Sequence, residues 1–174
     1  MPQTVTVTGV DDPLIDGTQT VAINLSIDQA NSDDDFDSIA AQTVSVDNAD
    51  NDAAGFAVTE TGGDTRVNEA GSTDSFTVVL DAQPDVNVVI IVQGSNNSEA
   101  IVAPAALIFT PANWNVGQAV TVTGVDDDRD DGDQTVTVTL AVDDANSDDN
   151  FDPLANQTVS STTVDDDVVG FVIV

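Results

Sequence analysis

The densest run of chemically useful side chains is the acidic segment Asp126–Asp133, which reads Asp-Asp-Asp-Arg-Asp-Asp-Gly-Asp. Its neighbouring carboxylates repel one another by about 1 kcal/mol per pair at about 4 Å, even in bulk water. Such a segment persists between ordered elements either because solvent and salt screen it or because a hard cation binds there. Ca²⁺ takes about six to eight oxygen ligands, which carboxylates and backbone carbonyls supply. We therefore take a cation site as the working hypothesis.

The elements on both sides of this segment are expected to be β-strands. Alternating Val and Thr residues cover 118–125 before the acids and 134–142 after them, so the acids form a loop between two strands. Strand 134–142 leaves that end of a sandwich and strand 157–164 returns to it, finishing in Asp165–Asp167. Two acidic clusters that are distant in sequence should therefore meet in space. The alternative is that these acids are the solvated loops of an acidic protein.

Strand signals dominate the rest of the chain, with period-two alternation and turn residues every ten or so positions. About seven strands within ~110 residues are typical of a two-sheet sandwich. The fold class is therefore all-β, a seven-stranded antiparallel Greek-key sandwich of the immunoglobulin type. The expected strands, with 86–92 apolar enough to be buried on both faces, are 3–10, 20–27, 42–47, 55–59, 67–69, 74–81, 86–92, 105–110, 118–125, 134–142 and 157–164.

The chain also resembles itself at an offset of 115 residues, as in Gln3–Asp12 against Gln118–Asp127 and Ala30–Asp34 against Ala145–Asp149. More than half of the compared positions are identical, with no gap. An internal repeat is stronger evidence about the fold than the secondary-structure propensity of any single segment. We expect a tandem array in which 1–49 is the C-terminal half of a preceding repeat, 50–167 is one complete repeat, and 168–174 is the first strand of the next.

Composition excludes several function classes. The chain of 174 residues carries 32 acids against two Arg, with no Lys, His or Cys and a net charge of −30. Nucleic acid is excluded as a partner, because its binding relies on Lys and Arg. No apolar run approaches the ~18 residues of a membrane span, so no membrane insertion is expected. The usual base for a Ser nucleophile is missing, so we expect no enzyme. The lack of Cys leaves the compartment open, and we expect an extracellular, cell-surface location.

Several of these motifs, in their order and spacing, resemble the Calx-β domain of sodium–calcium exchangers and of giant bacterial surface adhesins. They are Val67–Gly71, Leu107–Pro111, Gly124–Asp128 and Asp165–Asp167 before Gly170-Phe171. The resemblance implies a seven-stranded sandwich that binds Ca²⁺ at one end. Carried over by position, it implies these ligands: Glu69, Glu99, Asp126, Asp127, the carbonyl of Arg129, Asp131, Asp165, Asp166 and Asp167. Gln134 stands where the exchanger domain often has an acid, for which Asp133 is a substitute.

The earlier half repeat contributes further candidates. Its metal candidates, at or near the positions that correspond to that ligand set, are Asp11, Asp12, Asp16, Asp50 and Asp52. A second acidic loop, 144–152, has oxygen side chains at alternate positions but lacks the glycine and closing Glu of a Ca²⁺ loop; a solvated hairpin is the alternative. The half repeat leaves an apolar face and strand edges uncovered. We expect neighbouring repeats or strand exchange with another chain, for example through 168–174, to cover them.

The leading functional prediction is a calcium-binding structural extender module of a long secreted adhesin or extracellular fibre, with Ca²⁺ stiffening the acidic end and the junction between repeats. One alternative is an adhesion module that binds carbohydrate or protein, for which Trp114 is the aromatic candidate, although a cap on the sandwich end is the other interpretation of Trp114. Another alternative is an acidic surface domain of a halophile without a specific metal site.

Overall fold

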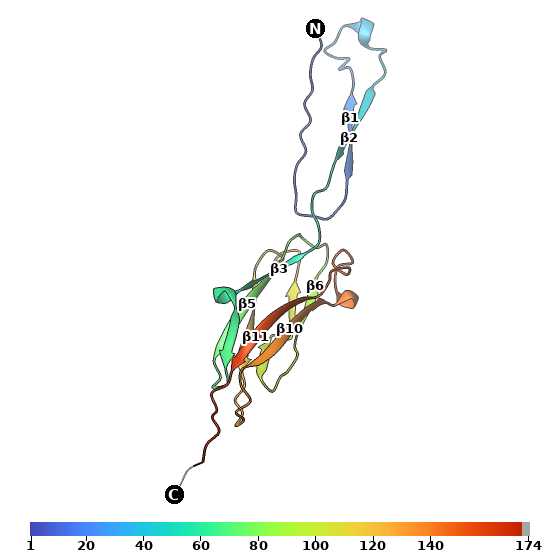
Figure 1. Cartoon of the computed structure of the whole chain (residues 1–174). Coiled ribbons are helices and arrows are strands. Elements are labelled where there is room, and N and C mark those ends of the chain that lie inside the picture. Colours follow the sequence, from blue (N-terminus) through green and yellow to red (C-terminus); the bar gives the residue numbers. More distant parts are fainter. Residues whose placement is uncertain (172–174) are drawn as a thin grey trace. The chain divides into compact units, whose positions relative to one another are not determined.

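The chain divides into two units, Met1–Asp52 and Ala53–Val174, in a computed structural model that describes residues 1–171. Figure 1 shows both units as all-β. The strands of the second unit are β3 (Phe56–Glu60), β4 (Thr65–Asn68), β5 (Thr73–Leu80), β6 (Val88–Gly94), β7 (Ala100–Ala103), β8 (Ala106–Phe109), β9 (Gln118–Gly124), β10 (Gln134–Val142) and β11 (Gln157–Val164). Two short 3-10 turns, η2 (Thr61–Gly63) and η3 (Asp144–Asn146), complete it.

The second unit is a sandwich of a five-stranded sheet, in the order β4-β11-β10-β6-β8, and a four-stranded sheet, in the order β3-β5-β9-β7. The sequence prediction of a β-sandwich is therefore confirmed, but seven antiparallel strands are wrong in two respects. Residues 53–171 of this unit contain nine strands, and β4 runs parallel to β11, with Ser161 opposite Thr65 and Val164 opposite Asn68.

The strand count differs because the first strand is split between the sheets. Gly62 and Gly63 adopt positive φ in η2, and this turn carries the chain from β3 in one sheet to β4 in the other. The short strand β7, at Ala100–Ala103, was not predicted, because four residues between a loop and Pro104 are too few to establish an alternation.

The core lies between the two sheets and is built from alternating residues of each strand. Phe76, Val78 and Leu80 of β5 are buried, as their alternation predicts. The expectation that 86–92 is buried on both faces is wrong: Val88 and Ile90 are fully buried, but Ile91 is 38% exposed. Strand β6 lies inside one sheet of a two-sheet sandwich, so only one of its faces meets the other sheet.

The N-terminal unit contains one hairpin, β1 (Gln19–Leu25) with β2 (Gln42–Asn48), and the short turn η1 (Asp34–Phe36) between them. The predicted strand at 3–10 is wrong, because these residues have no ladder partner and form no strand. Their counterpart in the second unit, β9, pairs with β5 on one side and β7 on the other. A strand exists only where neighbouring strands accept its hydrogen bonds, and the N-terminal unit has neither neighbour.

The two hairpins share one register at the offset of 115 residues. In β1–β2 the pairs run from Gln19 opposite Asn48 to Leu25 opposite Gln42. In β10–β11 they run from Gln134 opposite Thr163 to Leu140 opposite Gln157. Every pair of the first hairpin therefore maps onto a pair of the second, so the likeness in sequence is matched by a likeness in local structure.

Residues 165–171 follow the last strand of the sandwich and form no strand themselves. The remainder of the predicted strand 168–174, residues 172–174, lies outside the described residues. Over residues 1–171, the structure has no helix with the length and apolar character needed to cross a membrane.

Candidate metal centre

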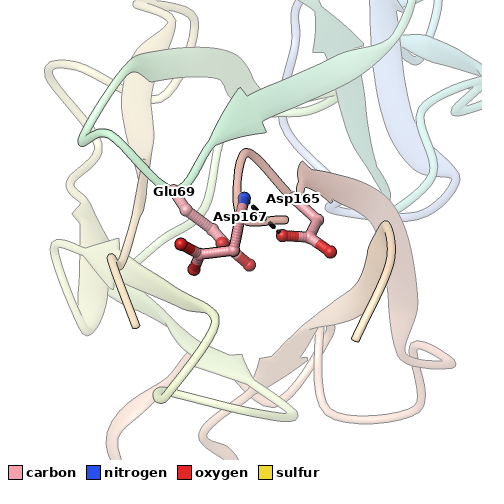
Figure 2. Close-up of side chains that lie close together, drawn as sticks. All are labelled: Glu69, Asp165 and Asp167. Atoms are coloured by element: carbon pink, nitrogen blue, oxygen red, sulfur yellow. Dashed lines mark hydrogen bonds between the residues drawn. The ribbon is translucent and has the colours of Figure 1, made fainter. Parts of the chain in front are cut away.

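Glu69 is the centre of the first acidic group. It directly follows β4, and its N–H donates to the carbonyl of Val164 at 3.1 Å, which fixes it beside the end of β11. Its side chain is only 1% exposed, and Figure 2 shows it directed toward Asp165 and Asp167. One carboxylate oxygen of each residue lies within 4.8 Å of the other two. Acids that are almost 100 residues apart in sequence are thus brought together, a grouping that the resemblance to the Calx-β domain implied and the strand order did not.

Glu99 is the centre of the second group, together with Asp127 and Asp131, whose carboxylate oxygens also lie within 4.8 Å of one another. Glu99 is 8% exposed and immediately precedes β7. Its carbonyl accepts from the Val125 N–H at 2.9 Å and from the Thr163 hydroxyl at 3.3 Å. These bonds hold the Glu99 backbone against both strands that lead into the acidic loops.

The acidic loops are themselves held by side-chain to backbone hydrogen bonds. Asp127 Oδ1 accepts from the Arg129 N–H at 2.8 Å, and Asp165 Oδ1 accepts from the Asp167 N–H at 2.9 Å, an Asx-type turn in each loop. Asp165 Oδ2 accepts from the Gly132 N–H at 2.6 Å, so the two loops are joined directly. In Figure 1 the loop after β9 and the segment after β11 lie at the same end of the sandwich.

Two oxygens in the first group are buried without a hydrogen-bond partner, Glu69 Oε2 and Asp167 Oδ2. A buried polar atom with no partner is rare in folded proteins, because desolvation without a compensating bond is costly. Both atoms belong to residues that meet in one acidic group. A group that brings positive charge or hydrogen-bond donors into this space would satisfy both atoms.

The electrostatic field at this end of the unit opposes ionisation. Burial raises the pKa of Glu69, and the charges of Asp165, Asp127, Asp131 and Asp167 raise it further. Burial also raises the pKa of Glu99, with Asp131 and Asp127 adding to the effect and Arg129 opposing it. Because Asp127 and Asp131 act on both glutamates, the two acidic groups share one field.

The donor set fits a hard divalent cation. All six side chains offer carboxylate oxygen, which is the ligand type that Ca²⁺ prefers, and the set holds no His or Cys. A divalent ion would supply the charge that the unpartnered oxygens lack and would reverse the repulsion that raises these pKa values. The residues that would hold such an ion are Glu69, Asp165 and Asp167 in the first group and Glu99, Asp127 and Asp131 in the second.

Other predicted ligands lie nearby without joining either group. Asp126 and Asp166 are exposed, and the Arg129 carbonyl accepts from the Asp131 N–H at 2.9 Å. Asp133, considered as a substitute ligand, instead pairs with Arg66 at 3.1 Å, with both side chains about half exposed. Such an exposed pair contributes little to stability.

The aspartates of the N-terminal unit repeat part of this arrangement. Gly17 N–H donates to Asp50 Oδ2 at 2.8 Å and Asp52 N–H to Asp50 Oδ1 at 2.8 Å, the same contacts that Gly132 and Asp167 make to Asp165. They line a hollow of about 240 Å³ together with Asp11, Asp12 and Asp16. No three carboxylates of residues 1–52 approach one another as closely as those around Glu69 and Glu99.

The second acidic loop has a structural role that sequence reasoning missed. Asp148 is 4% exposed, and its Oδ2 accepts from the N–H groups of Asp85 and Val86 at 2.7 and 3.2 Å. It thereby ties its loop to the turn before β6.

Trp114, considered as a ligand-stacking residue, is half-buried, and its carbonyl accepts from the Leu80 N–H at 3.1 Å. These long-range contacts leave no local signal in the sequence.

Comparison with known proteins gives likenesses in structure only. No family model matches the chain, and neither does any curated protein sequence. Among solved structures, the chain is similar to the apo form of the Calx CBD1 domain, with 14% identity and a TM-score of 0.44 over 64% of this chain and 98% of that one. SSP-19, an MSP-domain protein like family member of Caenorhabditis elegans, has 18% identity and a TM-score of 0.41 over 62% of this chain and 97% of that one.

The surface layer protein SbsC, domains 1–6, is similar over 73% of this chain, with 15% identity and a TM-score of 0.44. The alignment spans 15% of the length of that SbsC chain. At such identities these are likenesses in fold, so the functional proposal below rests on the residues of this chain.

Proposed function

We propose that the unit spanning residues 53–171 is a Ca²⁺-binding structural module of an extracellular surface protein. The observation that carries the proposal is the buried Glu69 carboxylate, 1% exposed, with an unpartnered oxygen among Asp165 and Asp167. A carboxyl buried among other acids is stable when it takes up a proton or when a cation compensates its charge, and a bound cation allows it to stay ionised at neutral pH. The resemblance of these motifs to the Calx-β domain points to the same ion.

The mechanism is charge compensation between segments that are distant in sequence. Without a divalent cation, the carboxylates after β4, β9 and β11 repel one another and weaken the contacts of these loops. With Ca²⁺ bound, Glu69 and Glu99 act as fixed ligands, because hydrogen bonds hold the backbone of each. The acidic loops after β9 and β11 are then drawn onto these two fixed ligands. A role in shape and stiffness, rather than in catalysis, is part of this proposal.

The position of the ligands favours a role as an extender module. Asp165 and Asp167 lie in the segment through which the chain leaves the sandwich, and the Val169 N–H donates to Asp130 Oδ2 at 2.8 Å. A cation that holds these aspartates would therefore also fix the direction in which the chain continues. In a tandem array of such units, this would stiffen each junction. We propose that the parent protein is a long surface adhesin or fibre in which neighbouring units succeed one another.

Calorimetric titration of the whole chain with CaCl₂ tests the proposal, together with thermal unfolding in Ca²⁺ and in chelator. When the free Ca²⁺ concentration is about 100 times the Kd of a site, binding at that site stabilises the folded state by about 2.7 kcal/mol. For a unit of about 120 residues the unfolding entropy near the midpoint is roughly 0.25 kcal/mol per kelvin. Each such site should then raise Tm by about 10 °C.

The variant Glu69→Gln removes one ligand charge and should abolish binding at the first group, with loss of about half of the Ca²⁺-dependent rise in Tm. Asp149→Asn is the matched control, since it removes one charge from an exposed residue of the other acidic loop. A melt that responds to NaCl but is the same in Ca²⁺ and in chelator would exclude the proposal and favour an acidic surface domain without a metal site.

A further inference from the structure

The N-terminal unit is the counterpart of half a sandwich. We call residues 53–117 the front half and residues 118–167 the back half of the second unit; residues 3–52 correspond to the back half at the offset of 115. In the second unit the front half provides β5 and β7 on either side of β9, β6 beside β10 and β4 beside β11. In the N-terminal unit the corresponding edges of β1, β2 and residues 3–10 have no such neighbours.

The side chains that the front half would cover are exposed in the N-terminal unit. Val21 is 54% exposed and its counterpart Val136 is 0% exposed; Phe36 is 52% exposed and its counterpart Phe151 is 0% exposed. The same contrast separates Val5, Val7, Leu25 and Val44 from Val120, Val122, Leu140 and Val159. An apolar hollow of about 270 Å³ lies between Val7, Val10, Val21 and Val46. The hairpin thus presents a sandwich interior without its second half.

A glycine of this unit has a side chain as its neighbour where its counterpart in the second unit has a backbone. In the second unit a Cβ on Gly124 would lie 1.9 Å from the Asn68 carbonyl oxygen, so the glycine allows β4 of the front half to approach β9. Gly9 occupies the corresponding position, but the nearest atom to a Cβ there is Oδ1 of the Asn48 side chain at 2.5 Å. A side-chain end can move away, whereas a backbone carbonyl cannot. Beside Gly9 the place of the front-half backbone is thus taken by the Asn48 side chain, whose Nδ2 donates to the Val10 carbonyl at 3.1 Å, and a docking segment would have to displace this side chain.

The acidic hollow is incomplete in the same way. Asp50 and Asp52 have the hydrogen bonds of Asp165 and Asp167, but residues 1–52 contain no glutamate at all, so neither Glu69 nor Glu99 has a counterpart there. Both glutamates come from the front half. A front half that docked onto this unit would therefore cover its apolar face, pair its strand edges and complete its acidic hollow together.

We propose that the N-terminal unit is an acceptor, and that its ligand is a polypeptide segment with the chemistry of residues 53–117: alternating apolar strands that carry glutamates placed as Glu69 and Glu99. A divalent cation joins the two across the completed hollow, and this part rests on the function proposed above. A second copy of this chain is a poor donor, because each copy has one front half for two back halves. If the front half docked onto the N-terminal unit of another copy, the back half of its own sandwich would be left uncovered.

The test joins an additional copy of residues 53–117 to the full chain, with Gly117 linked to Gln3 as it is linked to Gln118 within the sequence. Linkage makes docking intramolecular and raises the effective concentration of the donor. Hydrogen exchange at the amides of residues 3–10 is the readout. Docking should slow exchange there at least ~100-fold relative to the 174-residue chain. Exchange that stays as fast as in the unlinked chain overturns the proposal.

Two substitutions in β2 separate docking from non-specific effects. Val44 is 50% exposed and its counterpart Val159 is 3% exposed, whereas Ser45 and its counterpart Ser160 are both exposed. Val44→Asp should remove the protection of residues 3–10, and Ser45→Asp should retain it. Equal effects of the two substitutions overturn the proposal. Dimerisation of the unlinked chain in sedimentation that Val44→Asp abolishes would assign the face to a second copy and also overturn it.

Ca²⁺ stoichiometry distinguishes this inference from the proposed function. The linked chain should bind twice as many ions as the 174-residue chain, and Glu69→Gln with Glu99→Gln in the added copy alone should return the number to that of the unlinked chain. Protection of residues 3–10 without Ca²⁺ binding by either chain would sustain the acceptor and refute the proposed function. Ca²⁺ binding by the 174-residue chain without protection of residues 3–10 in the linked chain would support the proposed function and refute the acceptor.

Discussion

Substitution of the corresponding valines Val136 and Val21 should have very different effects, although both residues lie in hairpins of one register. Val136→Ala removes two methyl groups from a fully buried side chain, which costs about 1.6 kcal/mol in transfer free energy at ~0.8 kcal/mol per group. A residual cavity on the order of 40–50 Å³ adds about 1 kcal/mol at ~24 cal/mol per Å³. The unfolding free energy of the second unit should therefore fall by about 2–3 kcal/mol.

The control, Val21→Ala, removes the same atoms from a side chain of the N-terminal unit that is 54% exposed, and it should change the unfolding free energy of the second unit by less than ~0.5 kcal/mol. Urea unfolding in chelator, followed by fluorescence, is the assay. The single tryptophan of the chain, Trp114, lies in the second unit and reports its unfolding alone.

The Val136→Ala variant should show a lower midpoint with an unchanged m value, since the surface exposed on unfolding is the same. In thermal unfolding the same loss corresponds to a decrease in Tm of about 8–12 °C for a unit of ~120 residues. Midpoints that agree between the two variants would refute the assignment of Val136 to a closed core. A lower m value for Val136→Ala would instead indicate that the second unit does not unfold in one step.

One further prediction compares corresponding glycines of the two units, and another concerns the second acidic loop, residues 144–152. Gly124→Ala should destabilise the second unit severely, because the added Cβ meets the backbone carbonyl of Asn68, whereas Gly9→Ala should change the Tm reported by Trp114 fluorescence by no more than a degree or two. Asp152→Asn should raise the Tm of the second unit in chelator at pH 7, since burial, followed by the charges of Asp144, Asp149 and Asp148, raises the pKa of Asp152. A carboxyl whose pKa is raised by folding destabilises the fold above its folded pKa, so this gain should vanish as pH falls toward the ordinary value of 3.8. A gain that persists at pH 3 would show that ionisation of Asp152 is not its cause.

The strands and the meeting of the acidic loops were predictable because both follow from local alternation. Strand β10 runs from Gln134 to Val142, as its alternation of Val and Thr predicts, and its partner β11 returns to the acids at Asp165. Once these two strands are antiparallel, the start of one lies beside the end of the other. The convergence therefore needed no knowledge of side-chain contacts.

Local alternation could not predict the burial of Glu69 or the crossing of the chain from one sheet to the other after β3. A glutamate after a strand is ordinarily exposed, and its 1% exposure results from β4 lying parallel to β11, a pairing between residues far apart in sequence. The strand at 3–10 failed for the opposite reason. Its alternation is as clear as that of β9, but alternation specifies a face, and a strand also requires neighbours on its edges.

The shared register of β1–β2 and β10–β11 has a consequence for synthesis on the ribosome. Residues 53–117 are made after one hairpin of this register and before the other, so a rival partner is available before the native one exists. Misassembly between similar segments is a characteristic hazard of repeated chains. The choice depends on positions at which the copies differ. One of them is Thr163, whose hydroxyl donates to the Glu99 carbonyl and whose counterpart is Asn48.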